Sequence, residues 1–205
     1  MAERLLLVVE GPDDKHVIWA IVKRHDFKPE FEVKEEGGYE ALRERLSSRL
    51  KPGSDLERLG IVVDADTDAA ARWQSFKGIL ERAGYANVPE QPEPEGTVVE
   101  HDILPNVGVW IMPDNLQKGR IEDFLSFLVP EDDTLIGRAR ASLEGIPVEE
   151  RRFPVHRHTK ALIHTWLAWQ KEPGKPLGQA ITARYFEAEG PRVAAFLGWL
   201  TRVFA

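Results

Sequence analysis

Two short apolar segments of this chain each end in acidic side chains, and this pattern constrains the fold more than any other feature. Residues 5–9 lead directly into Glu10, and residues 59–63 lead into Asp64 and Asp66. Short, almost continuously apolar runs are typical of strands that are buried on both faces of a parallel sheet. Ligands of open α/β sheets bind outside the carboxyl ends of the strands. We therefore expect the three carboxylates to converge if the two strands are neighbours.

The N-terminal part of the chain alternates between helix-like and strand-like segments. Helical patterns run from Asp13 or Asp14 to about residue 23, over 39–50 and over 68–83, while 30–35, 97–100 and 107–112 resemble strands. Asp68 is a candidate N-cap and Gly84 is a helix stop signal. This alternation predicts an α/β fold with a mostly parallel sheet flanked by helices.

The C-terminal part has a different pattern. From Asp132 onward the chain is helical in character, with the strongest amphipathic segments at 159–171 and 192–204. We therefore expect residues 1–130 to form the α/β core and residues 131–205 to form a helical C-terminal extension packed on it. The six tryptophans fall in apolar surroundings and are expected to be core residues.

Composition limits the possible classes of protein. A chain of 205 residues with 42% hydrophobic content is long enough for one large core. It contains no cysteine, which excludes disulfides and thiolate zinc sites. No apolar run of about 18 residues is present, so no membrane span is expected. The N-terminal residues lack the layout of a signal peptide, and the predicted location is cytoplasmic.

Charge is distributed unevenly along the chain. The net charge is −7, yet residues 134–205 hold 11 Lys and Arg against 6 Asp and Glu. A basic region beside an acidic core suits a polyanionic substrate such as nucleic acid, with Arg151, Arg152 and Arg157 as candidate phosphate contacts. An ordinary solvated surface explains the same distribution equally well.

Converging carboxylates repel one another unless a cation neutralises them, and Mg²⁺ or Mn²⁺ is a suitable partner. Each acid also has a structural explanation. Glu10 would close a strand by accepting backbone hydrogen bonds, and Glu122 with Asp123 would stabilise the start of a helix through its dipole. Their combination with Asp64 and Asp66 favours a metal site and phosphate chemistry.

Three motifs together resemble the TOPRIM domain, the metal-binding module of topoisomerases, bacterial primases and several nucleases. They are Val9-Glu10-Gly11-Pro12-Asp13-Asp14, Val62-Val63-Asp64-Ala65-Asp66 and Gly119-Arg120-Ile121-Glu122-Asp123-Phe124-Leu125. The third is similar to the branch of overcoming-lysogenization-defect nucleases, and the whole chain resembles small stand-alone TOPRIM-like proteins. The resemblance covers roughly residues 4–130 and implies a TOPRIM-like Rossmannoid fold.

The resemblance also implies functional roles. Glu10, Asp64 and Asp66 would bind a metal, Glu122 would bind a second one, and Lys160 would stabilise the transition state. A solvent-exposed lysine remains the plainer interpretation of Lys160. Gly11 precedes a helix and would offer its backbone N–H to phosphate.

These roles predict a Mg²⁺- or Mn²⁺-dependent nuclease that hydrolyses nucleic-acid phosphodiesters. Two alternatives remain open: a non-catalytic metal- or nucleotide-binding sensor or partner module, and a small-nucleotide phosphohydrolase. The chain has no Walker A motif. A separate protein partner is therefore expected to supply any ATPase or targeting function.

Overall fold

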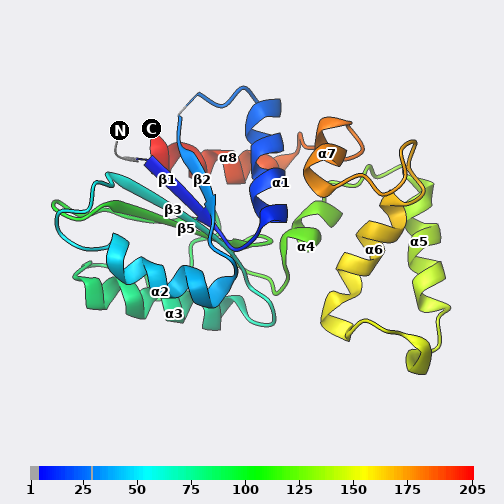
Figure 1. Cartoon of the computed structure of the whole chain (residues 1–205), viewed down its shortest axis with the longest axis horizontal. Coiled ribbons are helices and arrows are strands. Elements are labelled where there is room, and N and C mark those ends of the chain that lie inside the picture. Colours follow the sequence, from blue (N-terminus) through cyan, green and yellow to red (C-terminus); the bar gives the residue numbers. More distant parts are fainter. Residues whose placement is uncertain (1–4, 29) are drawn as a thin grey trace.

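The computed structural model describes residues 5–28 and 30–205, and Figure 1 shows their arrangement. The strands are β1 (Leu5–Val9), β2 (Glu32–Glu35), β3 (Arg58–Asp64), β4 (Thr97–Val99) and β5 (Asn106–Met112). The helices are α1 (Pro12–Arg24), α2 (Tyr39–Arg49), α3 (Ala69–Ala83), α4 (Ile121–Ser126), α5 (Thr134–Glu144), α6 (His158–Leu167), α7 (Leu177–Thr182) and α8 (Pro191–Phe204), with 3-10 turns η1 (Val148–Glu150) and η2 (Val155–Arg157).

The five strands form one sheet in the order β2-β1-β3-β5-β4. The first four are mutually parallel, and only β4 runs antiparallel to its neighbour β5. The predicted α/β fold with a mostly parallel sheet is therefore confirmed. The strands β1 and β3 are direct neighbours, with Val9 opposite Val62. The carboxylates that follow the two strands are expected to converge only if the strands are neighbours, and they are.

Each face of the sheet carries its own apolar core. Leu7 and Val9 point into the core that α1 and α8 cover, and Leu6 and Val8 point into the core that α2 and α3 cover. Figure 1 shows α1 and α8 on one side of the strands and α2 and α3 on the other. This double coverage explains why the central strands are apolar on both faces.

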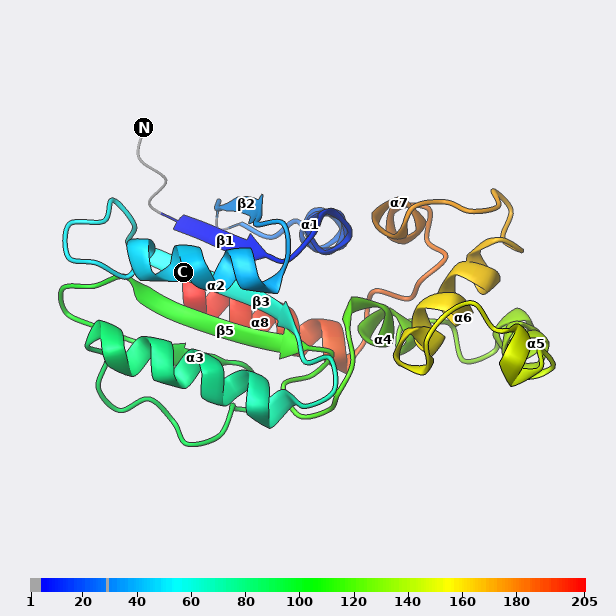
Figure 2. The same ribbon diagram turned by 60° about the horizontal axis from the view of Figure 1, so that its bottom comes forward.

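In the C-terminal segment, helix α8 packs against β3, β4 and β5 of the sheet. Helix α8 lies against β5, where a Cβ atom on Gly108 would come within 2.2 Å of Val203. Glycine at this position therefore permits the close approach of helix and strand. Helices α5 and α6 lie beyond α4, to one side of the sheet, and α7 packs against α1 (Figures 1 and 2).

Several local predictions are confirmed and others are wrong. Asp68 caps α3 by accepting the N–H of Ala71, and Gly84 ends it in the left-handed conformation. Helix α1, however, begins at Pro12 with Gly11 as its N-cap, since proline is well suited to the first helical position. Trp19 and Trp169 are 55% and 42% exposed, so they are not core residues.

The structure adds one observation about membranes. Over residues 5–28 and 30–205, none of the helices has the combination of length and apolar character that a bilayer crossing requires.

Candidate functional site

The carboxyl ends of β1 and β3 meet the start of α4, as the strand directions in Figure 2 show. One carboxylate oxygen of Glu10 accepts the backbone N–H of Asp64 at 2.9 Å. The carboxylate of Asp64 in turn accepts the backbone N–H of Ile121, the first residue of α4, at 3.1 Å. The structure therefore brings together two strand-end acids and the Gly119–Leu125 segment, which are distant in sequence.

A fourth acid at this place was not identified from sequence. Asp14, in the first turn of α1, is only 8% exposed and accepts the N–H of Gly11 at 2.9 Å. The sequence pattern indicated only a helix cap. A useful signal was its position three residues after Gly11, because the third helical residue folds back toward the residue that caps the helix.

Glu122 completes the cluster from α4. Its side chain is buried, and its carboxylate receives a hydrogen bond from the Lys160 ammonium at 2.6 Å. Lys160 also lies 3.8 Å from Asp13. Partial burial alone would lower the pKa of Lys160, but the hydrogen bond and charge of Glu122 raise it above its ordinary value. The structure thus brings Lys160, from α6, to this cluster. We call Glu10, Asp14, Asp64 and Glu122 the strand-end acids.

The strand-end acids disfavour one another's negative charge. Burial raises the pKa of Asp64 well above its usual range, and the charges of Asp14, Glu10 and Glu122 raise it further. Burial, with repulsion from Glu10 and Glu122, raises the pKa of Asp14 to about 7. Burial also raises the pKa of Glu10. This pattern is typical of carboxylates that lack sufficient compensating positive charge.

Asp66 occupies a different position from the one its spacing suggested. Strand β3 ends at Asp64, and Asp66 has a left-handed backbone (φ 55°), bridged to Gly119 by two backbone hydrogen bonds. Side chains two residues apart share one side only along an extended strand, and the left-handed backbone of Asp66 ends that alternation. The Asp66 carboxylate instead pairs with Arg72 at 2.6 Å and with Arg120 at 2.7 Å.

The four residues that the sequence predicts to contact phosphate are Gly11, Arg151, Arg152 and Arg157, and they differ in whether their polar groups are already hydrogen-bonded within the chain. The backbone N–H of Gly11 is hydrogen-bonded to Asp14, and the guanidinium of Arg151 donates to the carbonyls of Glu144 and Ile146. These groups therefore already serve the local structure. Arg152 and Arg157 are exposed. The charge of Arg157 is close enough to oppose protonation of Lys160, which places Arg157 near the cluster.

The donor chemistry of the strand-end acids fits a hard divalent cation, because carboxylate oxygens are the ligands that Mg²⁺ and Mn²⁺ prefer. Within the described part of the chain, however, no three His, Asp or Glu side chains stand together in a metal-coordinating arrangement. The carboxylates are turned instead toward backbone N–H groups and Lys160. To hold such an ion, the side chains would have to rearrange, and Glu122 would have to give up its contact with Lys160.

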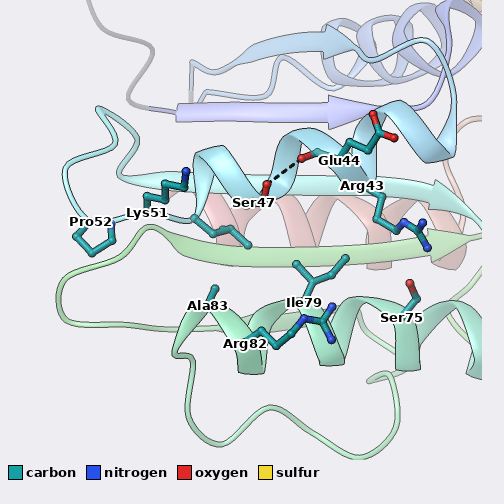
Figure 3. A pocket seen from close by; sticks show the side chains of 10 residues that line it. Arg43, Glu44, Ser47, Lys51, Pro52, Ser75, Ile79, Arg82 and Ala83 are labelled. Atoms are coloured by element: carbon teal, nitrogen blue, oxygen red, sulfur yellow. Dashed lines mark hydrogen bonds between the residues drawn. The ribbon is translucent and has the colours of Figure 1, made fainter.

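A separate cavity of about 690 Å³ lies between α2 and α3 (Figure 3). Charged, polar and apolar side chains from both helices and from the turn after α2 line it; the lining includes Arg43, Glu44, Ser47, Lys51, Ile79 and Arg82. None of the strand-end acids is among its lining residues. This cavity and the acidic cluster are therefore distinct features of the molecule.

Comparison with known proteins gives one match. A family model described as "Protein of unknown function (DUF3226)" matches residues 4–205, almost the whole chain. No curated protein and no solved structure matches the chain. The site must therefore be interpreted from its own chemistry.

Proposed function

We propose a function for this chain, which belongs to the DUF3226 family of proteins of unknown function: it is a Mg²⁺- or Mn²⁺-dependent enzyme that hydrolyses nucleic-acid phosphodiesters. One observation carries the proposal. Four carboxylates, two of them buried and two partly buried, gather at the carboxyl ends of neighbouring parallel strands, and burial raises the pKa values of Glu10, Asp14 and Asp64. Functional sites are where such unfavourable charge is concentrated.

In this proposal Glu10, Asp64 and Glu122 hold the ion. When bound, the ion would supply polarisation of the phosphoryl group and activation of water at neutral pH. Asp14 lies beside these ligands, and its pKa of about 7 suits a proton acceptor that works near neutral pH. Lys160, released from Glu122, stabilises negative charge on the phosphate oxygens.

The cations around Asp66 have a second role in the proposal. Asp66 holds Arg72 and Arg120 at the edge of the site, and the Arg72 guanidinium also stacks on the ring of Tyr39 at 3.6 Å. A guanidinium fixed in this way is well suited to bind a phosphate. In this role Asp66 orients phosphate-binding groups, which replaces the ligand role that the sequence predicted for it.

The resemblance to the TOPRIM domain supports the same proposal. The Glu-Gly and Asp-x-Asp motifs belong to the neighbouring strands β1 and β3, and the Glu122-Asp123 pair opens α4 beside them. We propose accordingly that the fold is TOPRIM-like. The partners proposed are nucleic acid and a separate protein that supplies ATPase or targeting function.

One observation favours a second candidate function. The chain pairs its own cations with the acids, since Lys160 neutralises Glu122, and Arg72 and Arg120 neutralise Asp66. A site neutralised in this way suits a non-catalytic module in which a metal or nucleotide displaces these pairs and changes the conformation.

The test is a time course of cleavage of labelled single- and double-stranded DNA and RNA with Mg²⁺, Mn²⁺ or EDTA. The wild-type protein should cleave with either metal and not with EDTA, and Asp64→Asn should be inactive. Asp55→Asn, an exposed acid outside the site, is the matched control and should remain active.

Two outcomes would decide against catalysis. If the wild-type protein cleaves no substrate in Mn²⁺ at any length, the nuclease proposal is wrong. Calorimetry then separates the remaining functions: Mn²⁺ binding that is lost in Asp64→Asn supports the non-catalytic module, and no binding removes the metal site altogether.

A further inference from the structure

Within the described residues, β2 is the edge strand of the sheet and pairs on one side only, with β1. In the parallel ladder, Val9 lies opposite Glu35 and its carbonyl accepts the N–H of Glu36. Alternation along a parallel strand then directs the N–H and C=O groups of Glu32 and Lys34 toward β1, and those of Val33 and Glu35 away from the sheet. We propose that two copies of this chain pair their β2 strands antiparallel, about a twofold axis at Val33, into one continuous ten-stranded sheet.

Two β2 strands can pair with twofold symmetry in several registers, and the charges on the strand favour the register with its axis at Val33. With the axis at Val33, each Val33 exchanges both backbone hydrogen bonds with its copy, and each Lys34 lies opposite Glu32 of the other copy. With the axis at Lys34 or Glu35, by contrast, two like charges stand directly opposite each other. Opposite charges in directly facing pairs stabilise a sheet and like charges destabilise it. Glu32 and Lys34 are both exposed, on the face of the sheet that α2 covers.

An apolar patch adjoins the same edge on the other face of the sheet. Five apolar residues, Trp19, Val22, Phe27, Phe31 and Val33, together with Glu30 line a cavity of about 340 Å³ beside β2. Trp19 is 55% exposed, which is unusual for the largest apolar side chain. A twofold axis at Val33 brings this patch next to its copy, so that strand pairing, ion pairs and apolar burial occur in one interface.

Self-complementarity identifies the second copy as the occupant. A twofold interface must present the same surface to itself. The sequence Glu32-Val33-Lys34 satisfies this requirement, because reversing the strand places each charge opposite its counter-charge. An exposed strand edge flanked by an apolar patch otherwise risks uncontrolled association, and pairing with a copy covers it.

The test uses charge exchange in the full chain, with the mass in solution measured by light scattering over a dilution series. The wild-type protein should dimerise. Lys34→Glu places glutamates opposite glutamates, and Glu32→Lys places lysines opposite lysines. The dissociation constant of the dimer should therefore rise by about 10-fold or more for each variant alone. An equimolar mixture of the two variants should form a heterodimer, because both facing pairs are again opposite in charge.

Two further variants complete the design. The double variant Glu32→Lys with Lys34→Glu should dimerise like wild type, and Lys171→Glu, an exposed lysine remote from β2 in sequence, should leave dimerisation unchanged. Trp19→Ser should weaken the dimer through lost apolar burial. Circular dichroism melting confirms that each variant is folded.

The proposal is overturned by either of two results. One is a wild-type protein that is monomeric at every concentration. The other is a dimer in which Lys34→Glu and Glu32→Lys alone dissociate no more easily than wild type, since the interface then lies elsewhere. Recovery of the dimer in the mixture cannot come from unfolding of a variant, so it reports on the register itself.

Discussion

The molecule buries acidic side chains in two places, and they differ in how their charge is compensated. Glu36, just after β2, is 2% exposed and forms ion pairs with Arg45 and Arg49 of α2. Burial would raise the pKa of Glu36, but hydrogen bonds from the two arginines lower it below its ordinary value. Three of the strand-end acids, Glu10, Asp14 and Asp64, have raised pKa values instead.

This difference separates a structural acid from an acidic site. The fold supplies two cations for the single charge of Glu36, so the ionised form is stabilised by the chain alone. For the four strand-end acids, the contacting ammonium group is Lys160, and the remaining partners are the backbone N–H groups of Gly11, Asp64 and Ile121. The excess negative charge therefore remains available for a cation from solution.

The largest expected effect compares neutral amide variants at the two places. Glu36→Gln should lower the free energy of unfolding by about 3–5 kcal/mol, because it leaves the half-buried Arg49 without its charge partner. Asp64→Asn should leave the stability unchanged or raise it in EDTA, because it removes repulsion and keeps an oxygen for the N–H of Ile121. Urea denaturation at pH 8 measures both. Equal destabilisation by the two variants would show that the strand-end acids are structural too.

The next effect concerns the lysine beside the strand-end acids. Lys160→Met should reduce the cleavage rate by about 10²–10³-fold, the scale of losing one group that stabilises the transition state. Its affinity for Mn²⁺ should be unchanged or higher, because Lys160 no longer competes for Glu122. Rates in single turnover and Mn²⁺ calorimetry give the two values.

Lys171→Met, an exposed lysine just beyond α6, is the control for this variant and should behave like wild type. If Lys160→Met cleaves as fast as the wild-type protein, the proposed metal site still stands. That result would, however, remove Lys160 from the catalytic residues.

The pH dependence of stability gives a smaller effect with a defined sign. Burial and repulsion raise the pKa of Asp14 from 3.8 to about 7 in the folded protein, so between these values the folded state holds a proton that the unfolded state has released. Stability without metal should therefore fall as the pH rises from about 4 to 7, by up to about 1.4 kcal/mol per pH unit. The lowered pKa of Glu36 has the opposite consequence, a loss of stability only as the pH falls through its own lowered value.

Thermal melts of wild type and Asp14→Asn in EDTA measure this difference. The variant should have a flatter profile between pH 5 and 7, and Mg²⁺ should stabilise the wild type more at pH 8 than at pH 5. A wild-type profile that rises over this interval would contradict the raised pKa of Asp14.

The sequence predicts the strands and their neighbours better than it predicts the site. Residues 5–9 and 59–63 are apolar throughout, which only a strand covered on both faces explains, and the acids at their ends follow from that. Asp14 and Asp66 depend on loop geometry instead. Pro12 moves the start of α1 forward and turns Asp14 inward, and the left-handed backbone of Asp66 turns its carboxylate toward Arg72 and Arg120. The spacing of Asp14 from Gly11 becomes informative only once the start of α1 is known, and the conformation of Asp66 is not encoded in residue spacing.

The smallest effect extends the comparison to exposed cations near each place. Arg157 is exposed near Lys160, and Arg152 is exposed in the same segment before α6, whereas Arg43 and Arg82 are exposed at the α2–α3 cavity of Figure 3. If nucleic acid binds over the strand-end acids, the double variant Arg152→Ala with Arg157→Ala should reduce the slope of log affinity against log salt by about 2, because each phosphate contact contributes about 1. The matched pair Arg43→Ala with Arg82→Ala should leave the slope unchanged. Fluorescence anisotropy with a labelled oligonucleotide over a salt series measures both, and a larger reduction for the second pair would move the nucleic-acid surface to the α2–α3 cavity.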